Sequence, residues 1–423
     1  MEMQKLYELF NESTGVSTDT RRIKPGNLFF ALKGGHFNGN KFAEDALKAG
    51  AHAVIADELH FPENDKILLV DDVLRNLQLL ATHHRRQLNA RVLAVCGSNG
   101  KTTTKELIAR VLSSSFATYA TKGNLNNHIG VPLSLLELNH DHEFAVIEMG
   151  ANHLGETKRL CEIADPDCGL ITNNGKDHLE GYGSMEGVRR GNGELYDFLR
   201  AKNGWVFVCA DQPDLMHMSE GLQRITYGQA ATADCSGEIT ALFPFLQLQT
   251  ANVNLQTRLI GKYNFENIMA AVCVGRYFGV RDEQIKHAIE DYEPSNNRSQ
   301  VIRRGTNTFI LDAYNANPSS VNAALEHFTS LPAENKIVIL GDMAELGAAS
   351  EAEHREVVGK LQTANFKLVA LVGGEFSKAD QEKRYLHFTD AASLKSWFQS
   401  QPFDHCHILL KGSRVIGLEN IMR

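Results

Sequence analysis

In Arg91-Val-Leu-Ala-Val-Cys-Gly-Ser-Asn-Gly-Lys-Thr-Thr-Thr104, an apolar run ends at a glycine, a tight polar loop follows, and a helix-forming segment begins. We expect a strand, a glycine loop and a helix N-terminus in that order. The loop amides and the positive end of the helix dipole then converge on one point, where a phosphate group can replace water. The stretch therefore predicts a nucleoside triphosphate site.

The side chains of the loop agree with this interpretation. Lys101 would reach the outer phosphates as a cation, and the Thr102 hydroxyl could hold Mg²⁺. The general pattern G-x-x-x-x-G-K-[ST] requires glycine where Val95 stands, so this loop is the shorter G-x-x-G-K-T-T. An ordinary strand–turn–helix with a surface lysine is the alternative. The residues expected to contact the nucleotide here are Gly97, Ser98, Asn99, Gly100, Lys101, Thr102 and Thr103.

The bulk composition limits the class of protein. A chain of 423 residues predicts two or three domains. The net charge of −8 argues against a general nucleic-acid or lipid-surface binder. We expect no membrane span and no secretory signal, because the apolar runs are too short. Seven cysteines without a C-x-x-C pair suit a reducing compartment, so the expected location is the cytoplasm.

The order of apolar runs and helical stretches predicts an α/β protein of three domains. Residues 1–88 form a small mixed α/β domain, with strands at 28–32, 53–56 and 66–70 and helices at 40–49 and 73–88. Residues 89–296 form a central P-loop-type domain with a mostly parallel sheet covered on both faces. Its strands are expected at 92–96, 144–148, 169–172, 205–209 and 255–260, and its helices at 101–114, 154–163, 185–200 and 264–278.

The third domain, residues 297–423, is predicted to be Rossmann-like. Strands at 309–312, 337–340, 368–372 and 408–411 alternate with helices at 318–330, 351–364, 390–399 and 413–421. It lacks G-x-G-x-x-G after its first strand, so we assign it no dinucleotide.

Two further side chains follow apolar strands, where ligands of parallel sheets bind. Glu148 ends the run Phe144-Ala-Val-Ile-Glu148, and a carboxylate at that position suits a Mg²⁺ ligand. His178 follows the next strand and could also bind metal. The alternatives are a carboxylate that caps the next turn and an ordinary polar loop histidine.

Several blocks in order resemble the Mur ligases of peptidoglycan synthesis. They are the short phosphate loop, Gly123-Asn-Leu-Asn-Asn-His-Ile-Gly-Val-Pro132, Val146-Ile-Glu-Met-Gly-Ala-Asn-His153, His178-Leu-Glu-Gly-Tyr-Gly183, Ile310-Leu-Asp-Ala-Tyr-Asn-Ala-Asn-Pro318, Gly341-Asp-Met-Ala-Glu-Leu-Gly347 and Leu410-Lys-Gly-Ser-Arg414. The later blocks are most similar to the family members that add D-alanyl-D-alanine to a UDP-N-acetylmuramoyl-tripeptide. The third residue of that tripeptide, meso-diaminopimelate or lysine, stays open.

The resemblance implies ATP-dependent amide formation through an acyl phosphate, by a monomer that uses Mg²⁺ and small-molecule substrates and binds no nucleic acid. By resemblance, Lys101, Glu148 and His178 are catalytic, and Thr102, Glu148 and His178 hold metal. The resemblance also implies ATP contacts from Asn264, Asn267, Arg298, Asp312 and Tyr314. For Asn264 we expect in addition a helix-capping role.

The implied substrate contacts are spread over the chain. UDP would meet Ser17, Thr18, Arg21, Asn38 and Gly39. The muramoyl-peptide would meet Asn124, Asn126, Asn127, Asn152 and His153. The dipeptide and the loop of the third domain would involve Asn315, Asn317, Ser319 and Lys411.

One position departs from the family. The family carries a lysine, modified to a carbamate, where this chain has Asn192, and no lysine occurs between Lys176 and Lys202. Asparagine cannot form a carbamate. Our hypothesis is that Asn192 contacts the second Mg²⁺ through its carbonyl or a water, or helps to hold a bound anion.

Two other functions compete with this one. A folylpolyglutamate-type ligase shares the short loop and the general chemistry, but the N-terminal domain and the Tyr-Asn-Ala-Asn-Pro block argue against it. A nucleotide-dependent switch would need no platform for a second substrate.

Overall fold

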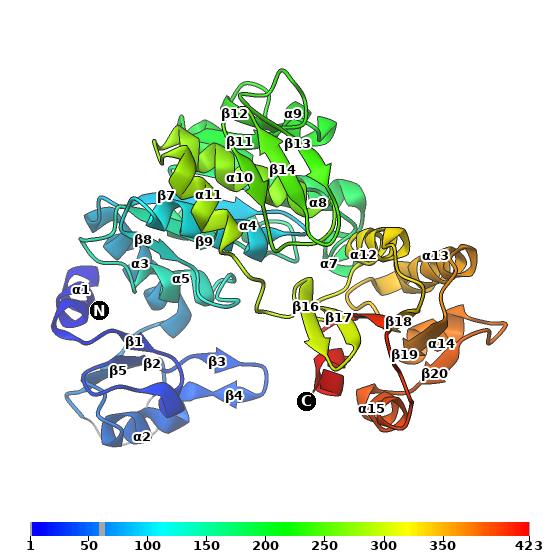
Figure 1. Ribbon diagram of the computed structural model, residues 1–423. Coiled ribbons are helices and arrows are strands. Elements are labelled where there is room, and N and C mark those ends of the chain that lie inside the picture. Colours follow the sequence, from blue (N-terminus) through cyan, green and yellow to red (C-terminus); the bar gives the residue numbers. More distant parts are fainter. Residues whose placement is uncertain (1, 59–63, 423) are drawn as a thin grey trace. The chain divides into compact units, whose positions relative to one another are not determined.

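The computed structural model describes residues 2–58 and 64–422 and divides into two compact units. The first unit comprises Met1–Val95, Phe116–Gly150 and Glu156–Gly169, and the second comprises Cys96–Ser115, Ala151–Gly155 and Leu170–Arg423. Each unit is described by itself below, with the element labels of Figure 1. Parallel strands dominate the sheets and helices alternate with them, so the predicted α/β class is confirmed.

The first unit begins with a four-stranded parallel sheet in the order β1-β2-β5-β6, at the blue end of Figure 1. Its strands are β1 (Val16–Ser17), β2 (Leu28–Phe30), β5 (Ala53–Ala56) and β6 (Ile67–Leu69). The helices are α1 (Met3–Glu12), α2 (Ala43–Lys48) and α3 (Val73–Gln87), with short 3-10 turns at Thr20–Arg22 and Gly39–Phe42. The predicted strands and helices are present. Helix α1, strand β1 and the hairpin of β3 (Lys33–Gly34) and β4 (Phe37–Asn38) were not predicted.

The first unit also contains parallel strands in the order β7-β9-β8. These are β7 (Arg91–Cys96), β8 (Thr118–Ala120) and β9 (Phe144–Glu148), accompanied by α5 (Gly130–Leu135) and α6 (Glu156–Ala164). Every residue of β9 and all but the first of β7 are buried. A strand covered on both faces reads as a continuous apolar run, and this is why the sequence predicts both strands well.

The second unit starts with the helix that follows the phosphate loop. Its central helices are α4 (Lys101–Ser113), α7 (Leu179–Tyr182), α8 (Met185–Ala201), α9 (Pro213–Met218), α10 (Asn264–Tyr277) and α11 (Asp282–Glu290). Its central strands are β10 (Cys168–Ile171), β11 (Trp205–Cys209), β12 (Gln223–Gly228), β13 (Cys235–Ala241), β14 (Gln247–Thr250) and β15 (Asn254–Gln256). Strands β11, β12 and β13 are parallel, whereas β13, β14 and β15 form an antiparallel meander. The strand predicted at 255–260 is observed as β15, which ends at Gln256 and is therefore shorter than expected.

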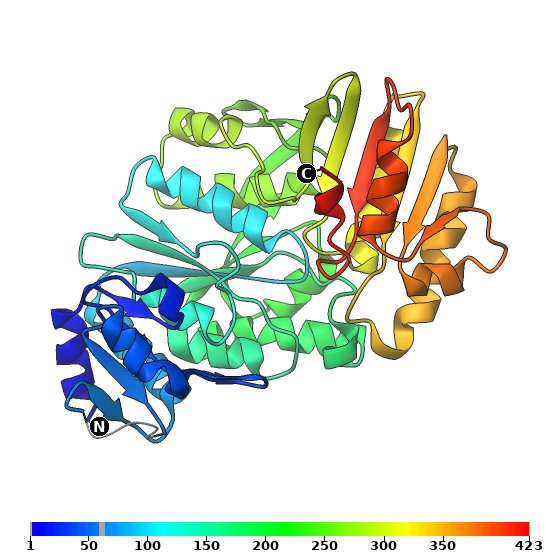
Figure 2. The ribbon, with the colours of Figure 1, turned by 90° about the horizontal axis from the view of Figure 1, so that it is seen from below.

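The C-terminal part of the second unit is a six-stranded sheet in the order β16-β17-β21-β18-β19-β20. Figure 2 shows these strands side by side, with the red β21 between neighbours that come earlier in the chain. The strands are β16 (Gln300–Arg304), β17 (Asn307–Asp312), β18 (Lys336–Gly341), β19 (Leu368–Val372), β20 (Leu386–Phe388) and β21 (His407–Lys411). Only β16 is antiparallel to its neighbour among these described strands.

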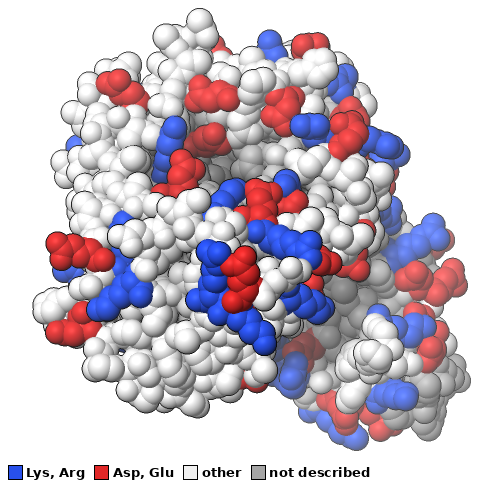
Figure 3. Space-filling view, turned by 90° about the vertical axis from the view of Figure 1, so that its right-hand side faces the viewer, with Lys and Arg blue, Asp and Glu red and all other residues white. Residues whose placement is uncertain are grey.

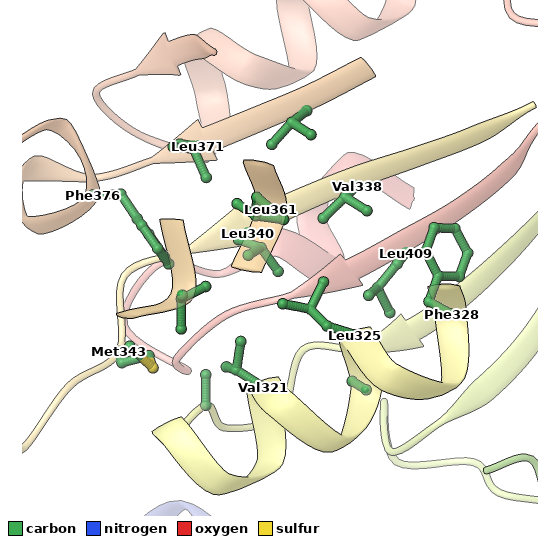
Figure 4. Packing of buried hydrophobic residues seen from close by; sticks show 14 of the residues in the cluster. Val321, Leu325, Phe328, Val338, Leu340, Met343, Leu361, Leu371, Phe376 and Leu409 are labelled. Carbon is green, nitrogen blue, oxygen red and sulfur yellow. The ribbon is translucent and has the colours of Figure 1, made fainter. Parts of the chain in front are cut away.

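Helices cover both faces of this sheet. On one face, α12 (Pro318–Ser330), α13 (Ser350–Thr363) and α14 (Gly374–Ala379) pack Phe328, Leu361 and Phe376 against the strands, as Figure 4 shows. On the other face, α15 (Ala391–Gln399) and a 3-10 helix (Leu418–Met422) supply Leu394 and Leu418. The predicted helix over 413–421 is wrong at its beginning. The chain turns at 414–416, and Gly417 takes a φ of 68°, which ends any helix there.

Among the described residues, the helices are too short or too polar to cross a bilayer. Acidic and basic side chains intermingle over the face in Figure 3, instead of separating into broad surfaces of one sign.

Candidate active site

The glycine loop has the backbone geometry of a phosphate cradle. Gly97 and Gly100 have φ values of 122° and 79°, a region that L-residues with a side chain rarely adopt. Neighbours also leave no room for a side chain, because a Cβ would lie 2.3 Å from Thr172 Oγ1 at Gly97 and 2.5 Å from Asn267 Oδ1 at Gly100. Helix α4 begins at Lys101, so its free N–H groups point back toward the loop.

Lys101 and Thr102 are the first two residues of α4. Lys101 Nζ donates to the carbonyl oxygens of Gly97 at 2.5 Å and Ser98 at 3.0 Å, so the ammonium lies on the loop. Thr102 is buried at the first turn of α4. Both residues therefore lie at the loop for which the sequence predicts a phosphate site.

The segment that leads to His178 holds this loop in place, a role that was not predicted from the sequence. We call residues 172–178, which follow β10, the asparagine loop. The Asn99 N–H donates to Asn173 Oδ1 at 3.1 Å, and Asn173 Nδ2 donates back to Asn99 O at 3.0 Å. The Ser98 N–H also donates to Asn173 O at 2.9 Å. The position of Asn173 just beyond a parallel strand is a signal that could have identified it.

Asn192 lies on α8 and faces the asparagine loop. It is 4% exposed, its Nδ2 donates to Asn174 Oδ1 at 2.8 Å, and its Oδ1 accepts from the Cys96 thiol at 3.6 Å. Asn174 Nδ2 in turn donates to Asp214 Oδ2 at 2.8 Å. At the position where an anionic carbamate was expected, this chain thus has the neutral amide of Asn192, which is hydrogen-bonded to the amide of Asn174.

His178 ends the asparagine loop in a left-handed conformation with a φ of 47°. Its Nδ1 lies 2.6 Å from Glu345 Oε2, and its Nε2 lies 3.5 Å from Asp177 Oδ2. Burial disfavours the imidazolium, but the interaction with Glu345 and the charges of both carboxylates outweigh burial, so the pKa of His178 is raised. The partner Glu345 was not predicted, because it lies far away in the sequence.

The two asparagines expected at adenine are engaged within the protein. The Thr104 hydroxyl donates to Asn267 Oδ1 at 2.9 Å, Asn267 Nδ2 donates to Asn264 Oδ1 at 2.8 Å, and Asn264 Nδ2 donates to Ile260 O at 2.8 Å. This chain of bonds ties α10 to the helix of the phosphate loop. The expected capping role of Asn264 is wrong, because Tyr263 is the N-cap of α10 and no side chain caps that end.

The residues predicted in the C-terminal sheet form a compact group. Lys411 is 2% exposed, and its Nζ donates to Asp312 Oδ2 at 2.6 Å and to Asn315 O at 3.3 Å. Asp312 Oδ1 accepts from the Ser299 N–H at 3.1 Å. The guanidinium of Arg298 stacks on Tyr314, with Cζ 3.9 Å from the ring centroid. An arginine on an aromatic ring next to an ion pair offers both a flat surface and charge to a nucleotide.

Helix α12 joins this group to the phosphate loop. Asn317 caps α12 by accepting from the Ser320 N–H, and its Nδ2 donates to Asn99 Oδ1 at 2.9 Å. Ser319 Oγ accepts from the Lys176 N–H at 2.8 Å. The structure therefore brings the predicted dipeptide residues next to the predicted phosphate site.

Asn152 and His153 also belong to the second unit. They lie against Gly181, where a Cβ would approach Asn152 O to 2.1 Å and His153 Nε2 to 3.0 Å. Both side chains are exposed.

Glu148 lies in the first unit, at the end of β9, and is 1% exposed. Asn126 Nδ2 donates to Glu148 Oε1 at 2.8 Å. Asn127 has a structural role, because its Oδ1 accepts from the Gly130 N–H at the start of α5. Asn124 is exposed.

The residues predicted for UDP form two groups in the first unit. Arg21 donates to both carboxylate oxygens of Asp19, and these hydrogen bonds lower the pKa of Asp19 to about 2. Ser17 Oγ and Thr18 lie just before this pair. In the second group, Asn38 caps a 3-10 turn, and Gly39 approaches the backbone so closely that a Cβ would lie 2.5 Å from Leu32 O. Among the described residues, no hydrogen bond or ion pair joins the two groups.

Comparison with known proteins adds independent findings. Three family models match in order: the Mur ligase family catalytic domain at residues 12–85, the Mur ligase middle domain at 95–275, and the Mur ligase glutamate ligase domain at 297–414. The chain is 34% identical to the UDP-N-acetylmuramoyl-tripeptide–D-alanyl-D-alanine ligases of Bacillus subtilis and Escherichia coli. These matches cover 97% and 96% of this chain and 92% of each relative.

Solved structures give the same similarity. A crystal structure of MurF from Acinetobacter baumannii matches with a TM-score of 0.88 at 30% identity, over 99% of this chain and 97% of that one. MurF from Thermotoga maritima, in complex with ADP, matches with a TM-score of 0.85 at 26% identity, over 98% of this chain and 97% of that one.

Proposed function

Because the chain belongs to the Mur ligase family, we propose that it is an ATP-dependent ligase that joins D-alanyl-D-alanine to a UDP-N-acetylmuramoyl-tripeptide. The observation that carries this proposal is the phosphate loop, whose two glycines leave no room for side chains and whose lysine starts a helix. Similarity to ligases of that name over almost the whole chain supports the choice of substrates.

The reaction must first give a carboxylate a leaving group, because a carboxylate repels nucleophiles. The terminal carboxylate oxygen of the tripeptide attacks the γ-phosphorus of ATP, and ADP leaves. The amine of D-alanyl-D-alanine then adds to the carbonyl carbon of the acyl phosphate. The tetrahedral intermediate loses phosphate, the nitrogen loses a proton, and the amide remains.

Lys101 and the loop amides carry the first step in this proposal. ATP and the carboxylate are both anions, so their approach needs positive charge. Lys101 would exchange the carbonyls of Gly97 and Ser98 for phosphate oxygens, and the amides of residues 98–103 would hold the rest of the phosphate chain.

A hydroxyl and a carboxylate fit Mg²⁺, which prefers oxygen ligands and keeps waters and phosphates in its shell. When bound with ATP, Mg²⁺ neutralises phosphate charge and polarises the transferred group. We propose the Thr102 hydroxyl and the Glu148 carboxylate as its ligands. We also propose His178 as a metal ligand through Nε2, because Glu345 engages only its Nδ1 and would orient the ring.

Asn192 remains our candidate for a contact to a second Mg²⁺, directly or through a water. Among the described residues, its Oδ1 accepts only a long contact from the Cys96 thiol, so a lone pair stays available. The amide carries no charge, and this chain would therefore use a weaker ligand than a carbamate.

We propose that the rest of the nucleotide lies between α10 and the C-terminal group. Arg298 and Tyr314 offer a stacked surface, and Asp312 is oriented by Lys411. The side-chain amides of Asn264 and Asn267 each donate one N–H within the protein. The second N–H of each amide would contact adenine. Closure of the C-terminal part over ATP would exclude water from the acyl phosphate.

The remaining predicted residues are proposed as substrate contacts. Residues 1–88 would bind the UDP-sugar, 89–296 ATP and the reacting carboxylate, and 297–423 the dipeptide. UDP is assigned to Ser17, Thr18, Arg21, Asn38 and Gly39, and the muramoyl-peptide to Asn124, Asn126, Asn127, Asn152 and His153. The dipeptide is assigned to Asn315, Asn317 and Ser319.

We propose that the enzyme acts as a monomer in the cytoplasm. All seven cysteines are buried thiols outside any disulfide, as suits a reducing compartment.

A phosphate-release assay tests the proposal. We expect ATP-derived phosphate only when the UDP-muramoyl-tripeptide and D-alanyl-D-alanine are both present with Mg²⁺. Release of phosphate without either substrate would indicate a nucleotide switch and would overturn the proposal.

A further inference from the structure

Lys176 lies in the middle of the asparagine loop and attaches it to two helices at once. Its Nζ lies 2.7 and 3.0 Å from the two carboxylate oxygens of Glu353 on α13, and 3.4 Å from Glu356. The Glu353 side chain is only 12% exposed, against 37% for Lys176, so the pair is partly shielded from water. The backbone N–H of the same residue donates to Ser319 on α12.

Tight packing and hydrogen bonds connect the backbone around Lys176 to the phosphate loop. A Cβ on Gly175 would lie 2.7 Å from Asn99 Nδ2 and 3.1 Å from Ser319 Oγ. The glycine is thus wedged between the phosphate loop and α12. Asn173, three residues before Lys176, bonds to Asn99 in both directions. A shift of Lys176 therefore moves the partner that fixes the Asn99 backbone.

From this geometry we propose that Lys176 is a positioning residue: its ion pair with Glu353 sets the conformation of the asparagine loop and, through Asn173, that of the phosphate loop. The proposal deepens the ligase function and rests on it. Lys176 touches no reacting atom in this account. It determines where the loop holds the γ-phosphate relative to the carboxylate that attacks it.

Such a residue affects turnover more than binding. The amides and Lys101 still bind ATP when the asparagine loop is loosened, whereas a misplacement of about 1 Å lowers the rate of the chemical step strongly. A loss in kcat with little change in KM is the signature of an interaction that acts mainly in the transition state.

The chain offers a matched control. Lys360 also lies on α13 and donates to Glu356 at 2.8 Å, with both partners about half exposed. Glu356 is also the more distant partner of Lys176, at 3.4 Å, so this variant changes the weaker contact and leaves the closer Lys176–Glu353 contacts in place. Lys360→Met removes a lysine of the same helix surface without touching the Lys176–Glu353 pair.

The test compares Lys176→Met, Lys176→Arg, Glu353→Gln and Lys360→Met in the full chain. We expect Lys176→Met to lower kcat about tenfold and to change KM for ATP less than about threefold. Arginine should restore most of the rate, because it keeps the charge. Glu353→Gln should resemble Lys176→Met, the double variant should be no worse than either, and Lys360→Met should stay within about twofold of the wild type.

A second readout needs no turnover. In Lys176→Met, backbone amides of residues 97–104 and 172–178 should exchange with deuterium faster than in the wild type and in Lys360→Met. Wild-type kcat together with wild-type exchange in Lys176→Met would overturn the inference. So would equal losses in kcat and ATP affinity that arginine does not rescue, since these indicate general destabilisation. If Lys176→Met exchanges faster but the wild-type chain forms no amide, the proposed function is rejected and the coupling between the two loops stands.

Discussion

Asn192 Nδ2 donates to Asn174 Oδ1 at 2.8 Å, so a neutral amide pair joins helix α8 to the asparagine loop. Asn192 is almost fully buried, and Asn174 passes the contact on to Asp214. A buried amide that loses its partner keeps the full cost of its desolvation. The pair therefore contributes to the stability of the site as well as to its shape.

Replacement of Asn192 by alanine should destabilise the protein by about 1–3 kcal/mol, because the Asn174 carbonyl oxygen loses its donor. Urea unfolding followed by circular dichroism measures the change. Asn11→Ala, at an exposed position of α1, serves as the control and should be nearly neutral. An Asn192→Ala variant as stable as the wild type would show that the amide pair does not contribute to the free energy of unfolding.

Gly100→Ala should abolish or strongly weaken ATP binding. The new Cβ would meet Asn267 Oδ1 at 2.5 Å on a backbone with a φ of 79°, so the loop must distort. Calorimetry should show affinity at least about tenfold weaker, a loss of about 1.4 kcal/mol. Gly359→Ala on α13 is the matched control, because its Cβ meets nothing within 4 Å. That variant should bind ATP normally and be slightly more stable.

Lys101→Ala should weaken ATP binding and reduce phosphate transfer further, because the ammonium acts on charge that grows in the transition state. We expect kcat to fall by at least about 100-fold. Lys367→Ala, which changes an exposed lysine, should leave the rate unchanged. A Lys101→Ala variant with near-normal kcat would remove this residue from the mechanism.

Stability should fall in mild acid because of His327 on α12. Its ring is 7% exposed and stacks on Phe243 with centroids 5.6 Å apart. Burial lowers the pKa of His327 from 6.5 to about 4, so the unfolded chain takes up a proton more readily than the folded one. The stability that neutral His327 contributes is therefore complete above pH 6.5 and is lost as the pH falls from 6.5 toward 4.

The variant His327→Phe removes this proton uptake. Between pH 7 and pH 5, the free energy of unfolding should fall by about 2 kcal/mol less in the variant than in the wild type. Urea unfolding at the two pH values gives the comparison. Equal falls in both proteins would mean that His327 is protonated in the folded state.

The sequence predicts best the parts of the fold that are buried on both sides. Strands β7, β9 and β18 read as unbroken apolar runs because helices or neighbouring chain cover both faces. Edge elements leave a weaker pattern. Strand β16 reads Gln-Val-Ile-Arg-Arg and is half exposed, so it was not predicted. Strands β13 and β14 contain many polar residues and were also missed, whereas β15 was predicted as the longer strand 255–260.

The candidate site was also predicted only in part. The phosphate loop was predicted because its glycines, lysine and threonine are adjacent in the sequence and perform one task together. The contacts that hold the phosphate loop in place were not predicted. Asn99 and Asn317 are 218 residues apart, and Lys176 and Glu353 are 177 apart, so no local pattern announces either contact. Asn267 is predicted as an adenine contact, and the bond that its amide accepts from Thr104, 163 residues away, could not be predicted for the same reason.

The mass of the product tests the central claim most directly. The purified chain is incubated with ATP, Mg²⁺ and a UDP-N-acetylmuramoyl-tripeptide, together with equal amounts of D-alanyl-D-alanine and L-glutamate. We expect one new species, heavier than the tripeptide precursor by one D-alanyl-D-alanine less one water. A product that carries glutamate instead, or ATP consumption without any new amide, would contradict it.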